Sequence, residues 1–145
     1  MKTSFFKSDT SNVLLLFSML CIVIVFASCA RKMTFATSRV APAAEGHVKI
    51  KKDKNNNYSI NLKVKNLADP RRLTPSRRTY IVWMETQRDG TRNIGNLRTS
   101  SAFLSKTLKS SLSTVTPYKP TGFFITAENS ESPTYPNGEV VLRTK

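Results

Sequence analysis

The segment Asn57–Lys65 reads Asn-Tyr-Ser-Ile-Asn-Leu-Lys-Val-Lys. Apolar side chains stand at every second position, and polar side chains fill the positions between them. Because successive side chains of a β-strand point to opposite faces, this period of two predicts a strand with one buried face and one solvated face. It is the clearest strand in the chain, and it indicates the class of fold to expect around it.

A second alternating run lies just before this strand. Val48 and Ile50 alternate there with a histidine and two lysines. The residues between the two runs, Asp53–Asn56, are Asp, Lys, Asn and Asn, a composition typical of turns. We therefore expect the two runs to pair as a β-hairpin whose outer face carries four lysines: Lys49, Lys51, Lys63 and Lys65.

A buried strand is predicted at Thr79–Thr86, because both of its alternating sets of side chains are largely apolar. Such a strand is covered on both faces, which places Trp83 in the core. After a turn at residues 88–91, the next strand is predicted through Ile94 and Leu97. Gly95 inside it indicates a bulge or a close approach of the backbone.

The last third of the chain continues in the same way. Strands are predicted at Thr121–Ala127 and Glu139–Leu142, whereas Phe103–Leu112 fits either a strand or a short helix. About seven short strands over roughly 100 residues predict a single immunoglobulin-like antiparallel β-sandwich, an all-β fold that we assign to residues 45–145.

Residues 1–28 have the pattern of a segment that is removed during export. Lys2 and Lys7 precede an uncharged apolar run at residues 13–27, which is shorter than the roughly 20 residues of a membrane-spanning helix. The run ends in Phe26, Ala27, Ser28 and Cys29, which resembles the lipobox of bacterial lipoproteins. The resemblance implies cleavage before Cys29 and lipidation of this cysteine. An uncleaved signal anchor is the alternative.

Cysteine use agrees with lipidation. Cys21 lies inside the apolar run, so no thiol is left for a disulfide or a metal site once Cys29 carries lipid. Residues 29–44 show neither strand alternation nor a helical stripe, and we expect them to form the lipidated cysteine and a flexible tether. Few charged residues precede residue 29, so nearly all of the chain's net charge of +14 belongs to the part that follows it.

Four short motifs in the second half follow one another in a recognisable order: Tyr80–Trp83, Asn93–Leu97, Phe124–Glu128 and Pro133–Leu142. This order resembles the C-terminal domain of anti-sigma-K factors. The resemblance implies an extracytoplasmic β-sandwich, which in that family follows a membrane helix and a cytoplasmic sigma-binding domain. Only twelve residues precede the apolar run here, too few to bury a core, so we expect the sigma-binding region to be lacking.

The inventory of reactive groups is small. His47 is the only histidine, and a zinc site of His and Cys needs three or four ligands. Glu85, Asp89, Glu128 and Glu131 lie in or beside turn-like sequence, where surface charges explain them better than acid–base catalysis. Glu128 is expected to cap backbone groups or to pair with an arginine. We therefore predict no catalytic residue, no metal and no cofactor, and hence not an enzyme.

Positive charge is the strongest remaining signal. The hairpin lysines share one face, and two arginine pairs flank residues 73–76. Like charges opposite one another on a sheet are unfavourable, and an anionic neighbour would relieve that cost. A merely solvated basic face is the alternative. The residues predicted to bind an anionic surface are Lys49, Lys51, Lys63, Lys65, Arg71, Arg72, Arg77 and Arg78.

These inferences lead to two hypotheses about function. The first is a non-catalytic lipoprotein of the bacterial cell envelope, lipid-anchored and facing the periplasm, at the outer membrane rather than the inner one. It would bind or sense an envelope protein through a domain similar to that of anti-sigma-K factors. The alternative is an envelope structural protein whose basic face binds anionic lipid, lipopolysaccharide or wall polymer. Nucleic acid is not expected as a partner.

Overall fold

The computed structural model describes residues 30–100 and 108–145, which fold almost entirely into strands. Within these two ranges, the single helical element is a short 3₁₀ turn, η1 (Pro70–Arg72). The strands are β1 (Arg31–Thr34), β2 (Glu45–Lys52), β3 (Tyr58–Lys65), β4 (Thr79–Thr86), β5 (Thr91–Asn96), β6 (Arg98–Ser100), β7 (Lys109–Thr116), β8 (Pro120–Glu128) and β9 (Glu139–Arg143).

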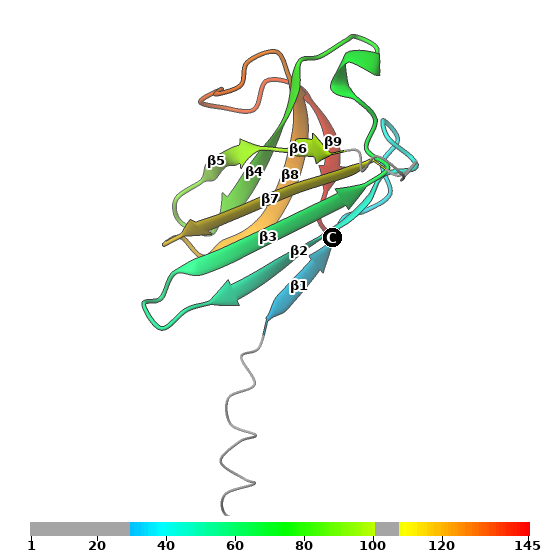
Figure 1. The fold of residues 1–145 in the computed structure, drawn as a ribbon. Coiled ribbons are helices and arrows are strands. Elements are labelled where there is room, and N and C mark those ends of the chain that lie inside the picture. Colours follow the sequence, from blue (N-terminus) through cyan, green and yellow to red (C-terminus); the bar gives the residue numbers. More distant parts are fainter. Residues whose placement is uncertain (1–29, 101–107) are drawn as a thin grey trace, which may run out of the picture.

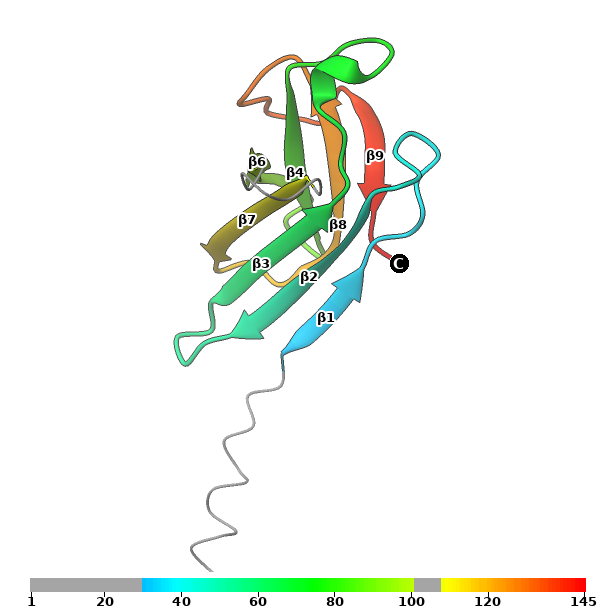
Figure 2. The same ribbon diagram turned by 45° about the vertical axis from the view of Figure 1, so that its right-hand side comes forward.

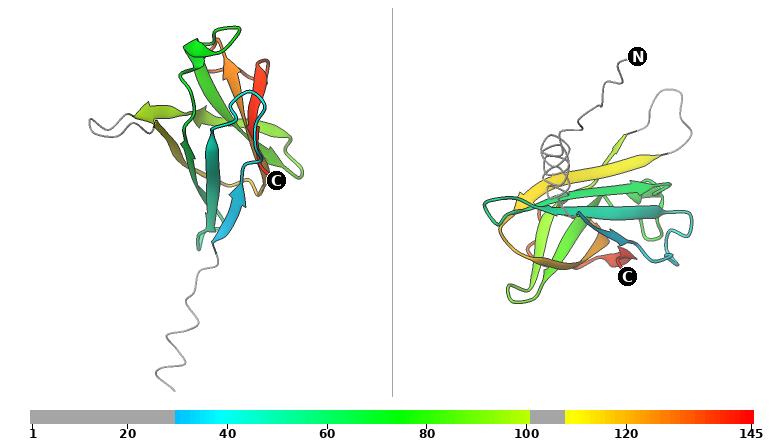
Figure 3. Two further views of the ribbon diagram at one scale, coloured as in Figure 1. Left: turned by 90° about the vertical axis from the view of Figure 1, so that its right-hand side faces the viewer. Right: turned by 90° about the horizontal axis from the view of Figure 1, so that it is seen from below.

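The strands form two antiparallel sheets packed face to face (Figure 1), so the predicted all-β sandwich is confirmed. One sheet has the order β1-β2-β3-β7-β6 and the other the order β5-β4-β8-β9. With β2 as the first strand, this is the strand order of immunoglobulin-like sandwiches, to which β1 is added at one edge. The view from below in Figure 3 shows the strands of the first sheet crossing those of the second.

The predicted hairpin is confirmed as β2 and β3. Val48 lies opposite Leu62, and Ile50 lies opposite Ile60, so the apolar sets of both strands share the inner face. In the turn, Asp53 Oδ1 accepts hydrogen bonds from the backbone N–H groups of Asn55 and Asn57, each at 2.8 Å. The turn therefore holds the register, and the register fixes which side chains face outward.

Strand β4 is central in its sheet, as predicted, and both of its faces are buried. Tyr80, Val82 and Met84 point into the space between the sheets. Beside it, β5 contains the expected bulge: Val82 pairs with Gly95 and Trp83 with Asn93, which leaves one extra residue in β5. Gly95 has φ 129°, a conformation that residues with a Cβ rarely adopt.

The core between the sheets is continuous and apolar. Each fully buried aliphatic or aromatic side chain contributes about 1.5–3 kcal/mol relative to an exposed one, so this layer supplies most of the stability. Leu67, just after β3, and Leu97, between β5 and β6, extend it to the loops. Its most buried members include Val48, Ile60, Leu62, Val82, Phe123 and Ile125.

Trp83 packs on the opposite face of β4, under the β8–β9 loop (residues 129–138). Its ring stacks on Phe124 with centroids 6.2 Å apart, and Nε1 donates a 2.8 Å hydrogen bond to Thr126 Oγ1. Thr126 in turn donates to Glu128 Oε1 at 2.7 Å. The same oxygen accepts the N–H groups of Asn137 (3.0 Å) and Gly138 (2.9 Å), so Glu128 ties this loop to the sheet.

The expectation of a flexible tether is wrong for residues 31–44. Strand β1 pairs with β2, with Met33 opposite Val48, and Phe35 bridges to Thr144 next to β9. Met33, Phe35, Ala41 and Ala44 are all buried. Figure 2 shows this segment beside β9 and the C-terminus, where it closes one side of the sandwich. The domain therefore begins near residue 31 rather than 45, because Phe35 and the residues around it cover core that would otherwise be exposed.

The remaining predicted elements fall as follows. Strands β8 and β9 are confirmed. Of the ambiguous segment Phe103–Leu112, residues 103–107 lie outside the described residues, and the part from Lys109 belongs to β7. The structure has two strands more than the seven or so expected, since β1 falls in the supposed tether and β6 spans only three residues.

Candidate functional site

The outer face of the five-stranded sheet carries a cluster of lysines that we call the lysine face. The side chains that alternate with the core residues of β1, β2, β3 and β7 point outward here. Lys32 lies opposite Lys49, and Lys65 lies opposite Lys109. All six lysines of the face are exposed: Lys32, Lys49, Lys51, Lys63, Lys65 and Lys109.

The spacing of these charges follows from the sheet. Directly opposed residues on neighbouring strands have Cβ atoms about 4.5–5.5 Å apart, and like charges at that distance are destabilising. Lys32, Lys49, Lys51, Lys63 and Lys65 form no ion pair within the described residues, although Glu45, at the start of β2, lies directly opposite Lys65. The face therefore holds more positive charge than this one carboxylate neutralises.

His47 lies on this face, opposite Lys63 and two residues away from Lys49 along the strand. Burial lowers the pKa of His47, and the charges of Lys32, Lys49, Lys63 and Lys65 lower it further. Because an imidazole with a lowered pKa is neutral at pH 7, His47 does not add to the positive charge there. The lowered pKa of His47 therefore reflects both its burial and the positive charges of the lysines around it.

A shallow hollow of about 230 Å³ lies at the β1–β2 end of the face, lined by residues that include Thr34, Glu45, Gly46 and His47. Gly46 does not shape this hollow, because its missing side chain would point to the inner face, where a Cβ would lie 2.7 Å from the backbone oxygen of Lys63 and 3.0 Å from Phe35 and Val64. Lys32, Lys63 and Lys65 line the hollow together with the carboxylate of Glu45, so its lining carries a net positive charge that suits an anionic group better than an apolar one.

The four predicted arginines do not share this face with the predicted lysines, and their role in binding an anionic surface stays a prediction. They lie in the loop between β3 and β4, at the end of the sandwich opposite the β2–β3 turn (Figure 1). Arg71 forms a two-point ion pair with Asp69, at 2.7 and 3.1 Å. Hydrogen bonds from Arg71 hold the pKa of Asp69 at about 2, so the charge of this arginine is already matched.

Two further arginines of this loop, Arg77 and Arg78, are tied to the neighbourhood of Glu128. The backbone N–H of Arg78 donates to the Glu128 carbonyl at 2.9 Å, and the charge of Arg77 acts on the Glu128 carboxylate. The two arginine pairs in the sequence thus correctly indicated a basic segment. Because this segment is a loop and lacks the alternation of a strand, the sequence could not show which way its side chains point.

Glu128 has the backbone-capping role expected of it. Burial raises the pKa of its carboxyl, but hydrogen bonds from the Gly138 N–H, the Thr126 hydroxyl and the Asn137 N–H outweigh burial, and the pKa lies below its usual value. A carboxylate held in this way is charged at neutral pH. One of its oxygens, Oε1, accepts the hydrogen bonds that hold the loop.

Lys32 and Lys109 are members of the lysine face that sequence reasoning missed. Lys32 lies in the segment taken for a tether, although Lys32, Met33, Thr34 and Phe35 alternate between polar and apolar side chains. That short alternation was the available signal. Lys109 lies in the segment whose secondary structure was ambiguous, so its face could not be assigned.

The predicted anchor residues, Phe26, Ala27, Ser28 and Cys29, lie outside the described residues, and lipidation of Cys29 stays a prediction. Between residues 30 and 100 and between 108 and 145, the structure has no helix long and apolar enough to cross a membrane. Within the same ranges, no three His, Cys, Asp or Glu side chains gather as metal ligands would.

Comparison with known proteins gives no relative: no family model, no curated protein and no solved structure matches the chain. The resemblance to the C-terminal domain of anti-sigma-K factors therefore stays a prediction.

Proposed function

We propose that this chain is a non-catalytic, lipid-anchored binding module of the bacterial cell envelope whose lysine face binds an anionic envelope polymer, either lipopolysaccharide or an acidic wall polymer. The observation that carries this proposal is the set of five exposed lysines on β1, β2 and β3 that form no ion pair within the described residues: Lys32, Lys49, Lys51, Lys63 and Lys65. Anchoring through Cys29 is supported by the sequence alone.

Bringing the ammonium groups of neighbouring lysines side by side on a sheet costs free energy. An anionic polymer lying across the lysine face would offset this repulsion by attraction between the lysines and its own negative charges. A basic side chain near an anionic surface contributes about 1 kcal/mol. Five unpaired lysines can thus supply roughly 5 kcal/mol, corresponding to an equilibrium dissociation constant in the range of about 0.1–1 mM for a single contact.

Binding to lipopolysaccharide, measured with the full chain in neutral detergent, tests the proposal. The variant combining Lys49→Gln and Lys63→Gln should weaken binding by about 30-fold, the equivalent of about 2 kcal/mol. The matched control combines Arg71→Gln and Arg72→Gln, which removes the same charge from the distant loop and should change the affinity much less. Raising the salt concentration should weaken wild-type binding.

Equal weakening by the lysine and arginine variants would show that net charge alone matters and would overturn the assignment of the face. Anchoring is tested separately by Cys29→Ser, which should abolish lipid mass and membrane partitioning. Unchanged membrane partitioning of the Cys29→Ser variant would overturn the lipid anchor. The proposal for the lysine face would not be affected, because the binding measurement tests it separately.

A sensing role is the second candidate. It is supported by an order of motifs that resembles that of anti-sigma-K factors, together with a sandwich in which the strand containing Tyr80 and Trp83 is central. Crosslinking in intact cells separates the candidates. Recovery of one defined membrane regulator supports sensing, whereas recovery of bulk polymer supports the binding module.

A further inference from the structure

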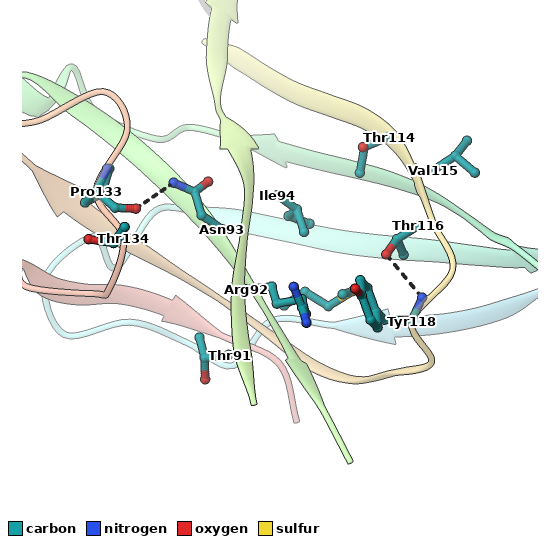
Figure 4. A pocket seen from close by; sticks show the side chains of 11 residues that line it. Thr91, Arg92, Asn93, Ile94, Thr114, Val115, Thr116, Tyr118, Pro133 and Thr134 are labelled. Atoms are coloured by element: carbon teal, nitrogen blue, oxygen red, sulfur yellow. Dashed lines mark hydrogen bonds between the residues drawn. The ribbon is translucent and has the colours of Figure 1, made fainter. Parts of the chain in front are cut away.

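A groove of about 530 Å³ lies on the side of the sandwich between β5 and β7 (Figure 4). The opposite side is closed by backbone hydrogen bonds that join the segment after β1 to the C-terminus, such as Ala36 N to Arg143 O at 2.9 Å. No such bonds join β5 to β7. The groove is away from the β1 edge, where the hollow of the lysine face lies.

Arg92 is the central residue of this groove. It lies opposite Met84, whose side chain is in the core, so the alternation of β5 turns Arg92 inward. Its guanidinium carbon lies 3.8 Å from the centroid of the Tyr118 ring. Stacking of this kind fixes the plane of the guanidinium and leaves its N–H groups directed along the plane.

Arg92 also has an unsatisfied donor. Its Nε is buried and has no hydrogen-bond partner in the described part of the chain, where it is the one buried side-chain nitrogen or oxygen in that condition. Arg92 forms no ion pair there either. A buried donor without an acceptor costs about 1–3 kcal/mol, more when the group is charged, so the groove holds a cation that lacks its acceptor.

The rest of the groove has a mixed lining. Threonines of β5, β7 and the β8–β9 loop line it beside apolar side chains such as Ile94 and Val115, and none of the side chains that line it is a carboxylate. The Thr116 hydroxyl accepts the Tyr118 N–H at 3.3 Å. Asn93 fixes one rim: its Nδ2 donates to the Pro133 carbonyl at 3.1 Å, and its Oδ1 accepts the Gly95 N–H at 2.9 Å. Figure 4 shows Arg92 and Tyr118 between this rim and the threonines of β7.

We propose that this groove binds a carboxylate-bearing sugar, a uronic acid unit. A guanidinium presents paired N–H groups that match the two oxygens of a carboxylate. The threonine hydroxyls suit the hydroxyl groups of a sugar ring, and the volume lies within the range of small-ligand sites. The site is separate from the lysine face, so it goes beyond the function proposed above and does not depend on it.

Titration calorimetry of the full chain with trigalacturonate tests the proposal, with the neutral trisaccharide of galactose as the matched ligand. Wild-type protein should bind the acidic sugar, with no detectable binding of the neutral one. Arg92→Gln should weaken binding at least about tenfold. The control Arg72→Gln, which removes an exposed arginine from the η1 loop, and the Lys49→Gln, Lys63→Gln pair should leave it within about twofold.

Thr114→Val keeps the shape of the groove and removes one hydroxyl, so it provides a second variant if Arg92→Gln fails to fold. It should weaken binding severalfold. Absence of trigalacturonate binding, equal binding of the neutral sugar, or equal losses in Arg92→Gln and Arg72→Gln would each overturn the proposal. Tighter binding of a triglutamate peptide would also overturn it, since the groove would then recognise carboxylates on a different class of ligand.

Discussion

Replacing Glu128 with glutamine should loosen the β8–β9 loop without changing the shape of the side chain. Glu128 Oε1 accepts three hydrogen bonds, from the Thr126 hydroxyl at 2.7 Å, the Asn137 N–H at 3.0 Å and the Gly138 N–H at 2.9 Å. An amide oxygen can accept the same bonds, but bonds to a charged acceptor are about twice as strong as neutral ones. A loss of roughly 0.7 kcal/mol per bond gives about 2 kcal/mol in all.

That loss corresponds to a fall of about 8 °C in the melting temperature of a domain of this size. Trp83 is the only tryptophan of the chain, and its Nε1 donates to Thr126 in the same network, so its fluorescence reports unfolding directly. Denaturant unfolding followed by this signal measures the change. The matched control is Glu131→Gln, an exposed carboxylate of the same loop, which should change stability by less than about 0.5 kcal/mol.

The difference between wild type and Glu128→Gln should also depend on pH. The pKa of Glu128 is lowered in the folded state, so its stabilising contribution is complete above the unfolded-state pKa of roughly 4.3. The contribution is lost as the pH falls through the folded-state pKa. The two proteins should therefore differ at neutral pH and converge in acid. A variant as stable as wild type at pH 7, or a difference that persists in acid, would refute the reasoning.

Three further predictions concern the domain boundary, the loop and the lysine face. Phe35→Ala should cost about 3 kcal/mol of unfolding free energy because the ring is buried, whereas Tyr135→Ala at an exposed ring should cost less than about 0.5 kcal/mol, both by thermal denaturation. Gly138→Ala should cost about 2–3 kcal/mol, because a Cβ there would lie 1.9 Å from a backbone oxygen of β8. Lys63→Gln should raise the pKa of His47 toward its ordinary value, measured by NMR titration.

Each has a clear contrary outcome. A Phe35→Ala protein with wild-type stability would show that the segment around Phe35 does not contribute to the folded domain, as the expected tether would require. Tolerance of alanine at position 138 would mean that the loop takes a different path past β8. The control for His47 is Lys54→Gln in the β2–β3 turn, which is not among the lysines that lower this pKa. Equal shifts in the two lysine variants would remove the evidence for a local field.

Elements with a strong local pattern were predictable from the sequence. The hairpin follows from alternation and turn residues that lie within about twenty positions of one another. Asp53 accepts backbone hydrogen bonds in the turn, as expected of an aspartate there. The buried β4 and the bulge at Gly95 were predicted for the same reason, because each depends on side chains of its own strand. Nothing outside these segments was needed to recognise them.

The domain boundary was not predictable in this way. Strand β1 has four residues, and the contacts that stabilise the segment after it come from residues 143–145, more than a hundred positions away. A short strand with a distant partner leaves little periodicity to detect. The same applies to β6, with three residues.

The candidate sites show a similar division. Lys49, Lys51, Lys63 and Lys65 share a face as the period of two required, whereas the arginines sit in a loop to which no period applies. The groove around Arg92 combines side chains from β5, β7 and the two loops that follow β7 and β8. No single segment of the sequence contains a pattern for it, and only the packing of the sheets brings Arg92 over Tyr118.

The position of β1 limits how far an anchored domain could move. Only Ala30 separates Cys29 from the first residue of β1, and one extended residue spans about 3.5 Å. With lipid on Cys29, the domain would rest on the headgroups with almost no slack, held at the end that also carries the β2–β3 turn. The arginine loop would then stand beyond the eight residues of β3, roughly 26 Å further out. A partner of the lysine face would therefore meet it next to the membrane at the β2–β3 turn and up to about 26 Å from the membrane at Lys65, the last residue of β3.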